Sequence, residues 1–219
     1  GSFTNLDSMA ENLVTILLNV AENGNIDKDM IKIRKIHGEG TADTEITESV
    51  SVDKNVLESE MPKDVKDAKI CLLQYPIDAR ELQNSAKIIL SNPGEYQEYL
   101  DKEAKMLEEE VQKLVDCGVN VLFNNKKISD LGQHYLTKAG ILSAKRVKIG
   151  DLERLAKATG ANIVNNIREL TPEDIGEAGH VYEKWVFENR EYIFVEECKN
   201  KGTLNIMVHG STKHITDQL

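Results

Sequence analysis

Histidine, aspartate and glutamate are the residues of this sequence that could carry out acid–base catalysis or bind a metal. The five histidines never fall at the spacing that a metal site requires. His134 has the carboxylate of Asp130 one helical turn away, an arrangement in which a histidine can act as a general base. A structural histidine that bonds within the fold explains the same spacing, and we favour it. Runs of adjacent acids, such as residues 108–110, are typical of a solvated face.

Cysteine offers no clearer site. The three cysteines, Cys71, Cys117 and Cys198, are far apart and in no metal-ligand spacing. Cys71 and Cys117 lie in or beside apolar runs, so we expect buried thiols and a reducing compartment. No HExxH, phosphate-binding loop, nucleophile elbow or CxxC pair is present. The residue types alone therefore identify no enzyme and predict no metal site.

The amino-acid composition limits the classes of molecule that this chain is expected to bind. The 219 residues are 40% hydrophobic but only 5% aromatic, which predicts an aliphatic core. The net charge of −10 disfavours nucleic acid, whose phosphates require clustered cations. We expect the one basic cluster to be solvated surface (Lys138, Lys145, Arg146 and Lys148). There is no signal peptide and no apolar run near ~20 residues, which predicts a cytoplasmic chain without membrane contact. The opening Gly1-Ser2 pair is expected to be a cloning remnant.

A long amphipathic helix is the strongest local signal. Asn92 is a good N-cap, Pro93 suits the first helical position, and Gly118 suits the end. Apolar residues between these limits follow helical spacing (Leu100, Ala104, Leu107, Val111 and Leu114). A helix of this span is roughly 37 Å long. Because that exceeds the average helix, we expect one end to project from its domain.

Strands and helices alternate around this helix, which predicts an α/β fold with a parallel core and right-handed crossovers. Strands are expected at 31–36, 70–73, 119–123, 141–147 and 161–164, and helices after Ser129 and at 151–159. A half-buried strand is expected from Ile46 to Val52, where apolar and polar residues alternate. A hairpin is expected at 181–187 and 191–196, where much of the aromatic content lies, and alternation at 204–208 predicts a last strand.

Three further segments complete the chain. The helix predicted at 8–21 is apolar on more than one face, so we expect it to come from a larger protein. Gly38 and Gly40 lack the third glycine of a dinucleotide fingerprint and predict a flexible bend instead. The polar excursion at 75–92 returns by the long helix, which predicts a protruding finger with an apolar edge strand at 87–90.

Several segments, in order along the chain, resemble the group II chaperonins, the archaeal thermosome and the eukaryotic cytosolic chaperonin. The nearest match is ISDLGQHYL at 128–136, which is similar to the family's DLAQHYL motif. The others are DTEI at 43–46, LAKATGA at 155–161, TPEDIG at 171–176 and FVEECK at 194–199. The resemblance runs from Asn12 to the C-terminus and is greatest for the archaeal branch.

The resemblance implies a chaperonin apical domain: an α/β fold with a parallel-rich sheet, flanking helices, a β-hairpin and a long helical protrusion. It implies an intermediate-domain segment at 1–40, an apical substrate-binding domain at 41–209 with its protrusion at about 77–100, and a return segment at 210–219. Such domains bind unfolded polypeptides and close as a lid over a double ring of neighbouring subunits. The implied substrate-binding residues are Asp151, Arg154, Lys157 and Ala158; the protrusion residues are Leu82, Ile88, Ile89, Leu90 and Tyr96; and the hinge residues are Gly38, Gly40 and Gly210.

On helix 151–159 we expect Arg154, Lys157 and Ala158 to face outward, and Leu152, Leu155 and Ala156 to face the core. The family uses ATP and Mg²⁺, but the segments that bind them have no counterpart here, so the resemblance implies no cofactor and no catalysis for this chain. Gly132 replaces the family's usual alanine, at a cost of ~1 kcal/mol in helix propensity. His209-Gly210-Ser211 replaces an arginine and two glycines, which puts hinge flexibility in doubt. Two alternatives to this function stay open. The chain could be a small-molecule-binding or catalytic α/β domain, or it could serve only as an assembly element.

Overall fold

The computed structural model describes residues 27–38, 40–79, 92–188 and 190–210. The helix predicted at 8–21, the protrusion residues Leu82 and 88–90, and the segment 211–219 lie outside these ranges. The strands are β1 (Ile31–His37), β2 (Asp43–Thr47), β3 (Ser49–Val52), β4 (Asp64–Leu73), β5 (Val121–Asn124), β6 (Leu142–Ala144), β7 (Ile163–Val164), β8 (Gly176–Val186), β9 (Arg190–Cys198) and β10 (Leu204–Gly210). The helices are α4 (Pro93–Asp116), α5 (Asp130–Lys138) and α6 (Ile149–Thr159), with short 3-10 helices η1 (Lys28–Met30), η2 (Ile167–Glu169) and η3 (Pro172–Asp174).

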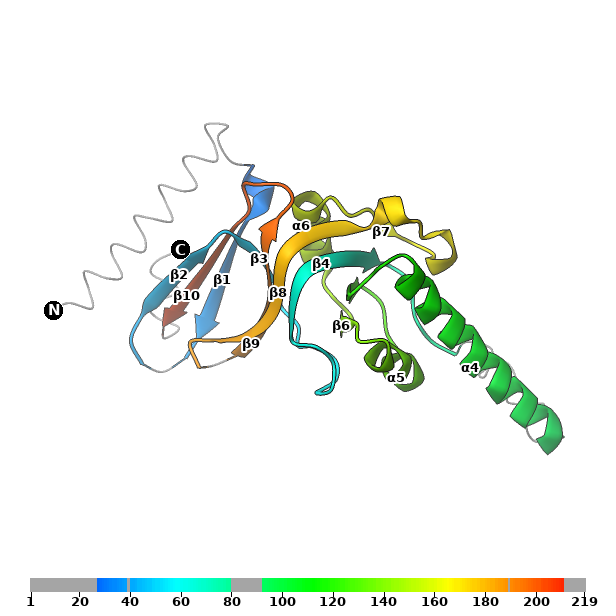
Figure 1. Ribbon diagram of the computed structural model, residues 1–219. Coiled ribbons are helices and arrows are strands. Elements are labelled where there is room, and N and C mark those ends of the chain that lie inside the picture. Colours follow the sequence, from blue (N-terminus) through cyan, green and yellow to red (C-terminus); the bar gives the residue numbers. More distant parts are fainter. Residues whose placement is uncertain (1–26, 39, 80–91, 189, 211–219) are drawn as a thin grey trace.

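The larger sheet has seven strands in the order β3-β9-β8-β4-β5-β6, with β7 beside β4 (Figure 1). The predicted α/β class is confirmed, but the sheet is mixed rather than parallel-rich. Strand β4 joins its two halves. The first part of β4 pairs antiparallel with β8, whereas Ile70 to Leu73 pair parallel with β5. The predicted hairpin, β8 and β9, therefore belongs to the same sheet as the βα units and makes half of it antiparallel.

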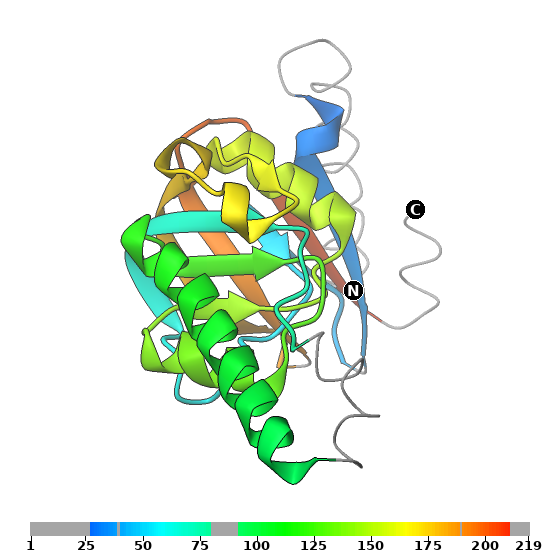
Figure 2. The same cartoon turned by 90° about the vertical axis from the view of Figure 1, so that its right-hand side faces the viewer.

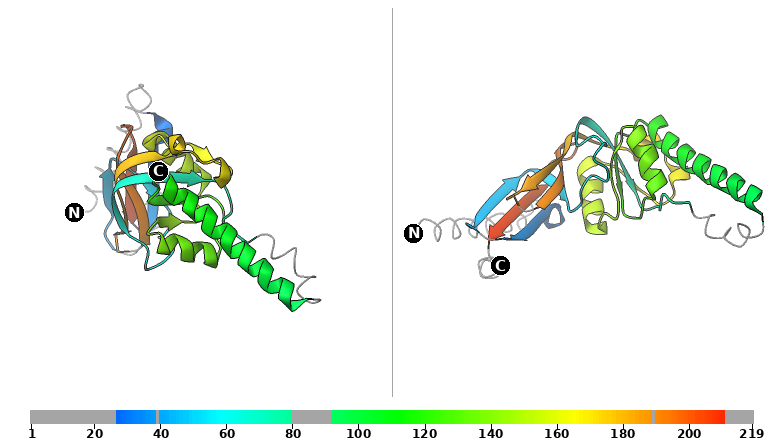
Figure 3. Two further views of the ribbon diagram at one scale, coloured as in Figure 1. Left: turned by 45° about the vertical axis from the view of Figure 1, so that its right-hand side comes forward. Right: turned by 90° about the horizontal axis from the view of Figure 1, so that it is seen from below.

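Helices cover both faces of the parallel half, as Figure 3 shows from below. Helices α4 and α5 pack against each other on one face, and α6 lies on the other, where it contacts β3, β4 and β8. The reason is topological: the chain passes outward from β4 to β5 to β6 and then returns to β7 on the far side of β4. Right-handed crossovers in opposite directions place their helices on opposite faces.

Strands β1, β10 and β2 form a separate three-stranded sheet, with β1 parallel and β2 antiparallel to β10. Met207 of β10 packs toward the hairpin with Phe194 and Tyr192, while Ile206 and Val208 alternate onto the other face. This sheet draws strands from residues on both sides of the predicted boundaries at 40/41 and 209/210. Those domain boundaries stay a prediction.

The single half-buried strand predicted from Ile46 to Val52 is wrong. The chain crosses from one sheet to the other at Glu48, so β2 ends at Thr47 and β3 begins at Ser49. All four residues of β3 are buried, because α6 covers one face of this strand and β10 lies against it. The alternation of apolar and polar residues predicted that one face of the strand is exposed to solvent. That face is covered where the two sheets pack together.

Two further strands are shorter than predicted. The run from Ile141 to Val147 contains only the three residues of β6, and the run at 161–164 contains only the two of β7. Arg146 has a positive φ of 54° and its amide donates to the carbonyl of Lys126, so the chain leaves the ladder after Ala144. Val147 lies beyond the end of the strand and is still fully buried, so an apolar residue there does not mean that the strand continues.

Strand β8 is strongly curved (Figure 1), and Gly179 lies within it. The ladders leave Asp67 of β4 and Glu197 of β9 unpaired opposite this glycine, although the register is the same before and after the gap. Asp67 and Glu197 both have positive φ, 48° and 54°. A side chain at Gly179 would come within 2.8 Å of Glu197 Cβ, so the glycine allows β9 to approach this closely.

Helix α4 confirms the predicted long helix. The Asn92 side chain accepts hydrogen bonds from the amides of Gly94 and Glu95, and Gly118 has a φ of 81° just after the helix. Leu107, Val111 and Leu114 are buried against the sheet, whereas the first turns are mostly exposed. Figure 1 and Figure 2 show that the N-terminal half of α4 extends beyond the body of the molecule.

Gly132 of α5 provides a test of this packing. A Cβ at this position would lie 2.8 Å from Ile77 Cγ2. Alanine gains about 1 kcal/mol in helix propensity, but forcing a methyl into a filled core costs about 1–3 kcal/mol. We predict that Gly132→Ala lowers the free energy of unfolding by about 1 kcal/mol. In an Ile77→Leu background, which lacks the methyl on Cβ, the same change should stabilise. Urea unfolding of the four proteins measures both effects, and stabilisation with Ile77 in place would contradict this account.

Candidate functional site

A groove of about 500 Å³ runs between α6 and the edge strand β1. Strand β1 forms one border of the three-stranded sheet, and η1 precedes it at one end of the groove. Helix α6 presents its outer side to this space. The lining residues come from both walls (Lys28, Asp29, Ile31, Lys32 and Ile33 on one side; Gly150, Glu153, Arg154 and Lys157 on the other).

Two of the four predicted substrate-binding residues, Arg154 and Lys157, line the groove. The expectation that Ala158 faces outward is wrong. Ala158 is fully buried because it falls on the same stripe as Leu155, toward the sheet. Asp151 is also buried, so its carboxylate does not reach the groove surface. Leu152 and Leu155 are buried as predicted, and Ala156 is partly exposed while packing against the core.

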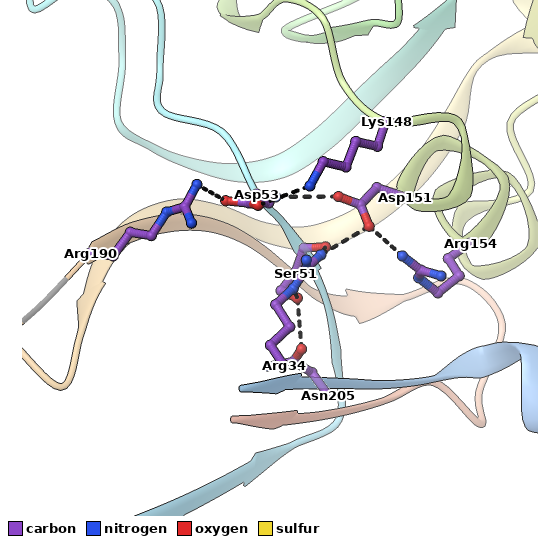
Figure 4. A network of polar contacts seen from close by, with 8 residues as sticks. All are labelled: Arg34, Ser51, Asp53, Lys148, Asp151, Arg154, Arg190 and Asn205. Carbon is purple, nitrogen blue, oxygen red and sulfur yellow. Dashed lines mark hydrogen bonds and ion pairs between the residues drawn. The ribbon is translucent and has the colours of Figure 1, made fainter. Parts of the chain in front are cut away.

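Asp151 is buried because it binds Arg34 of β1 (Figure 4). The Arg34 Nη2 lies 2.9 Å from Asp151 Oδ1, and Arg154 of the next helical turn donates to the same oxygen. Arg34 Nε also donates to Ser51 Oγ at 2.7 Å. The second carboxylate oxygen of Asp151 accepts from the Asp53 amide at 3.3 Å. A buried ion pair thus joins β1 to α6 with most of its hydrogen-bonding capacity used.

The network extends to the other strands at this junction. Ser51 Oγ donates to Asn205 Oδ1 of β10 at 2.6 Å, which links the two sheets. Asp53, directly after β3, lies 2.5 Å from Arg190 Nη2 and 3.4 Å from Lys148 Nζ. These contacts fix α6 at its first turn, where no side chain of the N-cap residue Lys148 bonds the helix. The junction of the two sheets therefore positions the groove.

Burial and neighbouring charges shift the pKa values of two side chains close to Arg34, those of Tyr192 and Lys32. Burial raises the pKa of Tyr192, whose ring lies 5.5 Å from Arg34 Cζ and 5.4 Å from Arg190 Cζ. Burial also lowers the pKa of Lys32, and the charges of Arg34 and Arg154 lower it further. Nothing in the sequence indicated that Arg34 is buried, because a charged residue in a strand normally faces solvent. Its partner in α6 lies 117 residues later in the chain, and no local pattern connects the two.

The predicted hinge glycines lie together. The Gly38 amide donates to the Gly210 carbonyl at 3.2 Å, and Gly210 is the last residue of β10, opposite His37. Gly40 has a φ of 112°, which a residue with a side chain rarely adopts. Since the Gly38 amide is already used within the sheet, this glycine pair does not fit a phosphate cradle. Whether the segment moves as a hinge stays a prediction.

The other predicted residues have simpler surroundings. Tyr96 is partly buried in the first turn of α4, where its amide donates to the Asn92 carbonyl. His134 is exposed on α5 against the ring of Tyr135. Cys71 is buried as expected, while Cys117 is only partly so. In the described ranges, no group of three metal-binding side chains gathers, and no helix is long and apolar enough to span a membrane.

Comparison with known proteins places the chain in a family. The model of the TCP-1/cpn60 chaperonin family matches residues 2–219. The chain belongs to this family. A thermosome beta subunit from Methanothermobacter thermautotrophicus is 45% identical over 213 residues, which are 97% of this chain and 39% of that protein. A thermosome subunit from Methanocaldococcus jannaschii is 44% identical over 198 residues, 90% of this chain and 36% of that protein.

A solved structure agrees with the sequence relatives. The open-state monomer of a group II chaperonin from Methanococcoides burtonii superimposes with a TM-score of 0.67 and 33% identity, and covers 87% of this chain and 41% of that one. The resemblance to group II chaperonins is thereby confirmed, and the mixed α/β fold is similar to part of such a monomer. The chain spans less than half the length of these relatives.

The buried pair supports a first prediction for this site. Asp151→Ala leaves the Arg34 guanidinium buried without its carboxylate, so the free energy of unfolding should fall by about 3 kcal/mol. Glu153→Ala, on the exposed side of the same helix, is the matched control and should change it by less than about 0.5 kcal/mol. Denaturant unfolding followed by circular dichroism measures both. Equal effects of the two substitutions would show that the pair does not hold α6.

Thiol chemistry supports a second prediction. Burial raises the pKa of Cys198 to about 11. Because only the thiolate reacts, alkylation of Cys198 by iodoacetamide should accelerate about tenfold per pH unit between pH 7 and 10, without a plateau. Cys71, fully buried, should stay unmodified in the folded protein. Peptide mapping by mass spectrometry gives both rates, and a plateau near pH 8.5 would contradict the raised pKa.

Proposed function

We propose that this chain is the substrate-binding and built-in-lid module of an ATP-dependent group II chaperonin that assists the folding of non-native proteins. The observation that supports it most is the groove between α6 and β1, on a body from which α4 projects. The groove provides a surface for polypeptide, and the projecting helix provides the root of a lid. Membership of the chaperonin family supports the proposal that the two features act in one folding machine.

The groove suits an extended polypeptide. In the described part of the chain, β1 is paired only on its β10 side, so its other edge can accept a strand. Ile31 and Ile33 line the space beside that edge, and Glu153, Arg154 and Lys157 supply polar contacts across it. A single groove of this size buries a short segment only. Affinity would therefore come from several copies in a ring.

The lid role rests on α4. Its buried half anchors it to the sheet through Leu107, Val111 and Leu114, and its exposed half extends from the body (Figure 3). We propose that the protrusion includes Tyr96 together with Leu82 and residues 88–90, and that it closes against neighbouring subunits of a double ring. Gly38, Gly40 and Gly210 would be the hinge on which the module moves.

The energy source would lie elsewhere in the protein. ATP and Mg²⁺ would bind in the parts of the relatives that this chain does not span, so we propose no cofactor and no catalysis for the chain itself. We also propose a cytoplasmic protein whose partners are unfolded polypeptides and its own ring neighbours, not nucleic acid or membrane. The acidic composition fits that assignment, because the chain carries a net charge of −10.

The alternative, a small-molecule site beyond the parallel strands, has less support. Polar residues do lie at the end of β5, but they bond within the fold. Asn124 Nδ2 donates to the Tyr75 carbonyl at 2.7 Å and its oxygen accepts from two amides. Asn125 Nδ2 donates to the Val147 carbonyl at 2.8 Å. These side chains hold loops together and leave few groups for a ligand.

Photocrosslinking tests the proposed surface. Benzoylphenylalanine replaces Glu153 in the groove, or Lys138 of α5 as a control; both positions are exposed, and α5 covers the opposite face of the sheet. With a permanently unfolded, carboxymethylated protein as the probe, the first variant should form adducts upon illumination and the second should not. Equal yields at the two positions, or no adducts at high concentration, would contradict polypeptide binding in the groove.

A further inference from the structure

The groove has a charge opposite to that of the chain. Four of its lining residues are cationic and two are anionic, whereas the whole chain carries −10 (Lys28, Lys32, Arg154 and Lys157 against Asp29 and Glu153). Net positive charge in a concave surface raises the local concentration of anions. Because the chain as a whole is acidic, the positive charge of the groove is a property of this site and does not follow from the overall composition.

The partners of these cations differ. Lys157 Nζ lies 3.6 Å from an Asp29 oxygen and 3.9 Å from an Asp27 oxygen. Arg154 is held by Asp151. Lys32, by contrast, forms no ion pair with any carboxylate in the described ranges. It lies two residues before Arg34 on the same side of β1, so its side chain points toward α6. Among the described residues, Lys32 therefore has no carboxylate that competes with a ligand at ion-pair distance.

The surroundings of Lys32 are crowded with positive charge. Partial burial together with Arg34 and Arg154 disfavours its ammonium form, which lowers its pKa. Arg154 Nε is buried and donates to no acceptor among the described residues. Lys32 therefore lies near two guanidinium groups whose carboxylate, Asp151, is already bound by both of them. A carboxylate placed there would relieve this repulsion.

We propose that the groove selects acidic segments of unfolded polypeptides: an extended stretch pairs with the edge of β1 and places a glutamate or aspartate against Lys32. The inference rests on the proposed client-binding function and names the class of segment that is bound. Backbone pairing with β1 supplies binding that does not depend on sequence, and the carboxylate supplies the preference. The preference should weaken with salt, because the groove is open to solvent.

Three fluorescent peptides of equal length test the preference. Each alternates the same apolar residues with glutamate, glutamine or lysine, and fluorescence anisotropy at low salt gives its dissociation constant. The glutamate peptide should bind about fivefold more tightly than the glutamine peptide, and the lysine peptide should be weakest. Equal binding of glutamate and glutamine peptides would overturn the selectivity alone. Failure of all three to bind would instead count against the proposed function.

Two variants assign the preference to its residue. Lys32→Gln should bring the ratio between the glutamate and glutamine peptides close to one, and Lys32→Arg should restore it. Lys138→Gln, which removes an exposed lysine on the opposite face, should leave the ratio as in the original protein. NMR of the ¹³C-methylated lysines adds an independent readout, since the acidic peptide should raise the pKa of Lys32. A ratio unchanged in Lys32→Gln, or a pKa of Lys32 that does not move, would refute the assignment.

Discussion

The buried ion pair between Arg34 and Asp151 determines how the two sheets and α6 lie relative to one another. Each partner comes from a different element, and Ser51 and Asn205 extend the contact to β3 and β10. Removing both charges from water is costly, and the hydrogen bonds around them offset that cost only in one geometry. The pair therefore specifies an arrangement more than it adds stability. The groove exists because that arrangement holds α6 beside the open edge of β1.

The rest of the fold separates two surfaces. Strand β4 carries the hairpin on one side and the βα units on the other, so one sheet supports both halves. Helix α6 lies on one face of this sheet, and α4 and α5 lie on the opposite face (Figure 3). In the proposed module, a rigid layer thus stands between the binding groove and the root of the lid. Movement of the protrusion would not need to disturb the groove.

Local signals in the sequence predicted most helices and strands. Side-chain partners and buried faces that depend on residues far apart in the chain could not be predicted in this way. Asn92 and Gly118 mark α4 by their own backbone chemistry, which depends on no distant residue. Arg34 gave no such signal, since its partner in α6 is adjacent only after both sheets have formed. Ala158 was assigned to the wrong face because helical spacing shows that residues share a stripe, not which stripe meets the sheet.

Hydrogen exchange on the whole chain tests the central claim most directly. With a permanently unfolded protein present in excess, the amides of β1 and α6 should exchange more slowly, because polypeptide fills the groove and pairs with the strand edge. Amides at the ends of β4, β5 and β6 should be unchanged. Protection confined to those strand ends, with β1 and α6 unaffected, would contradict the account and favour a ligand site of the other class.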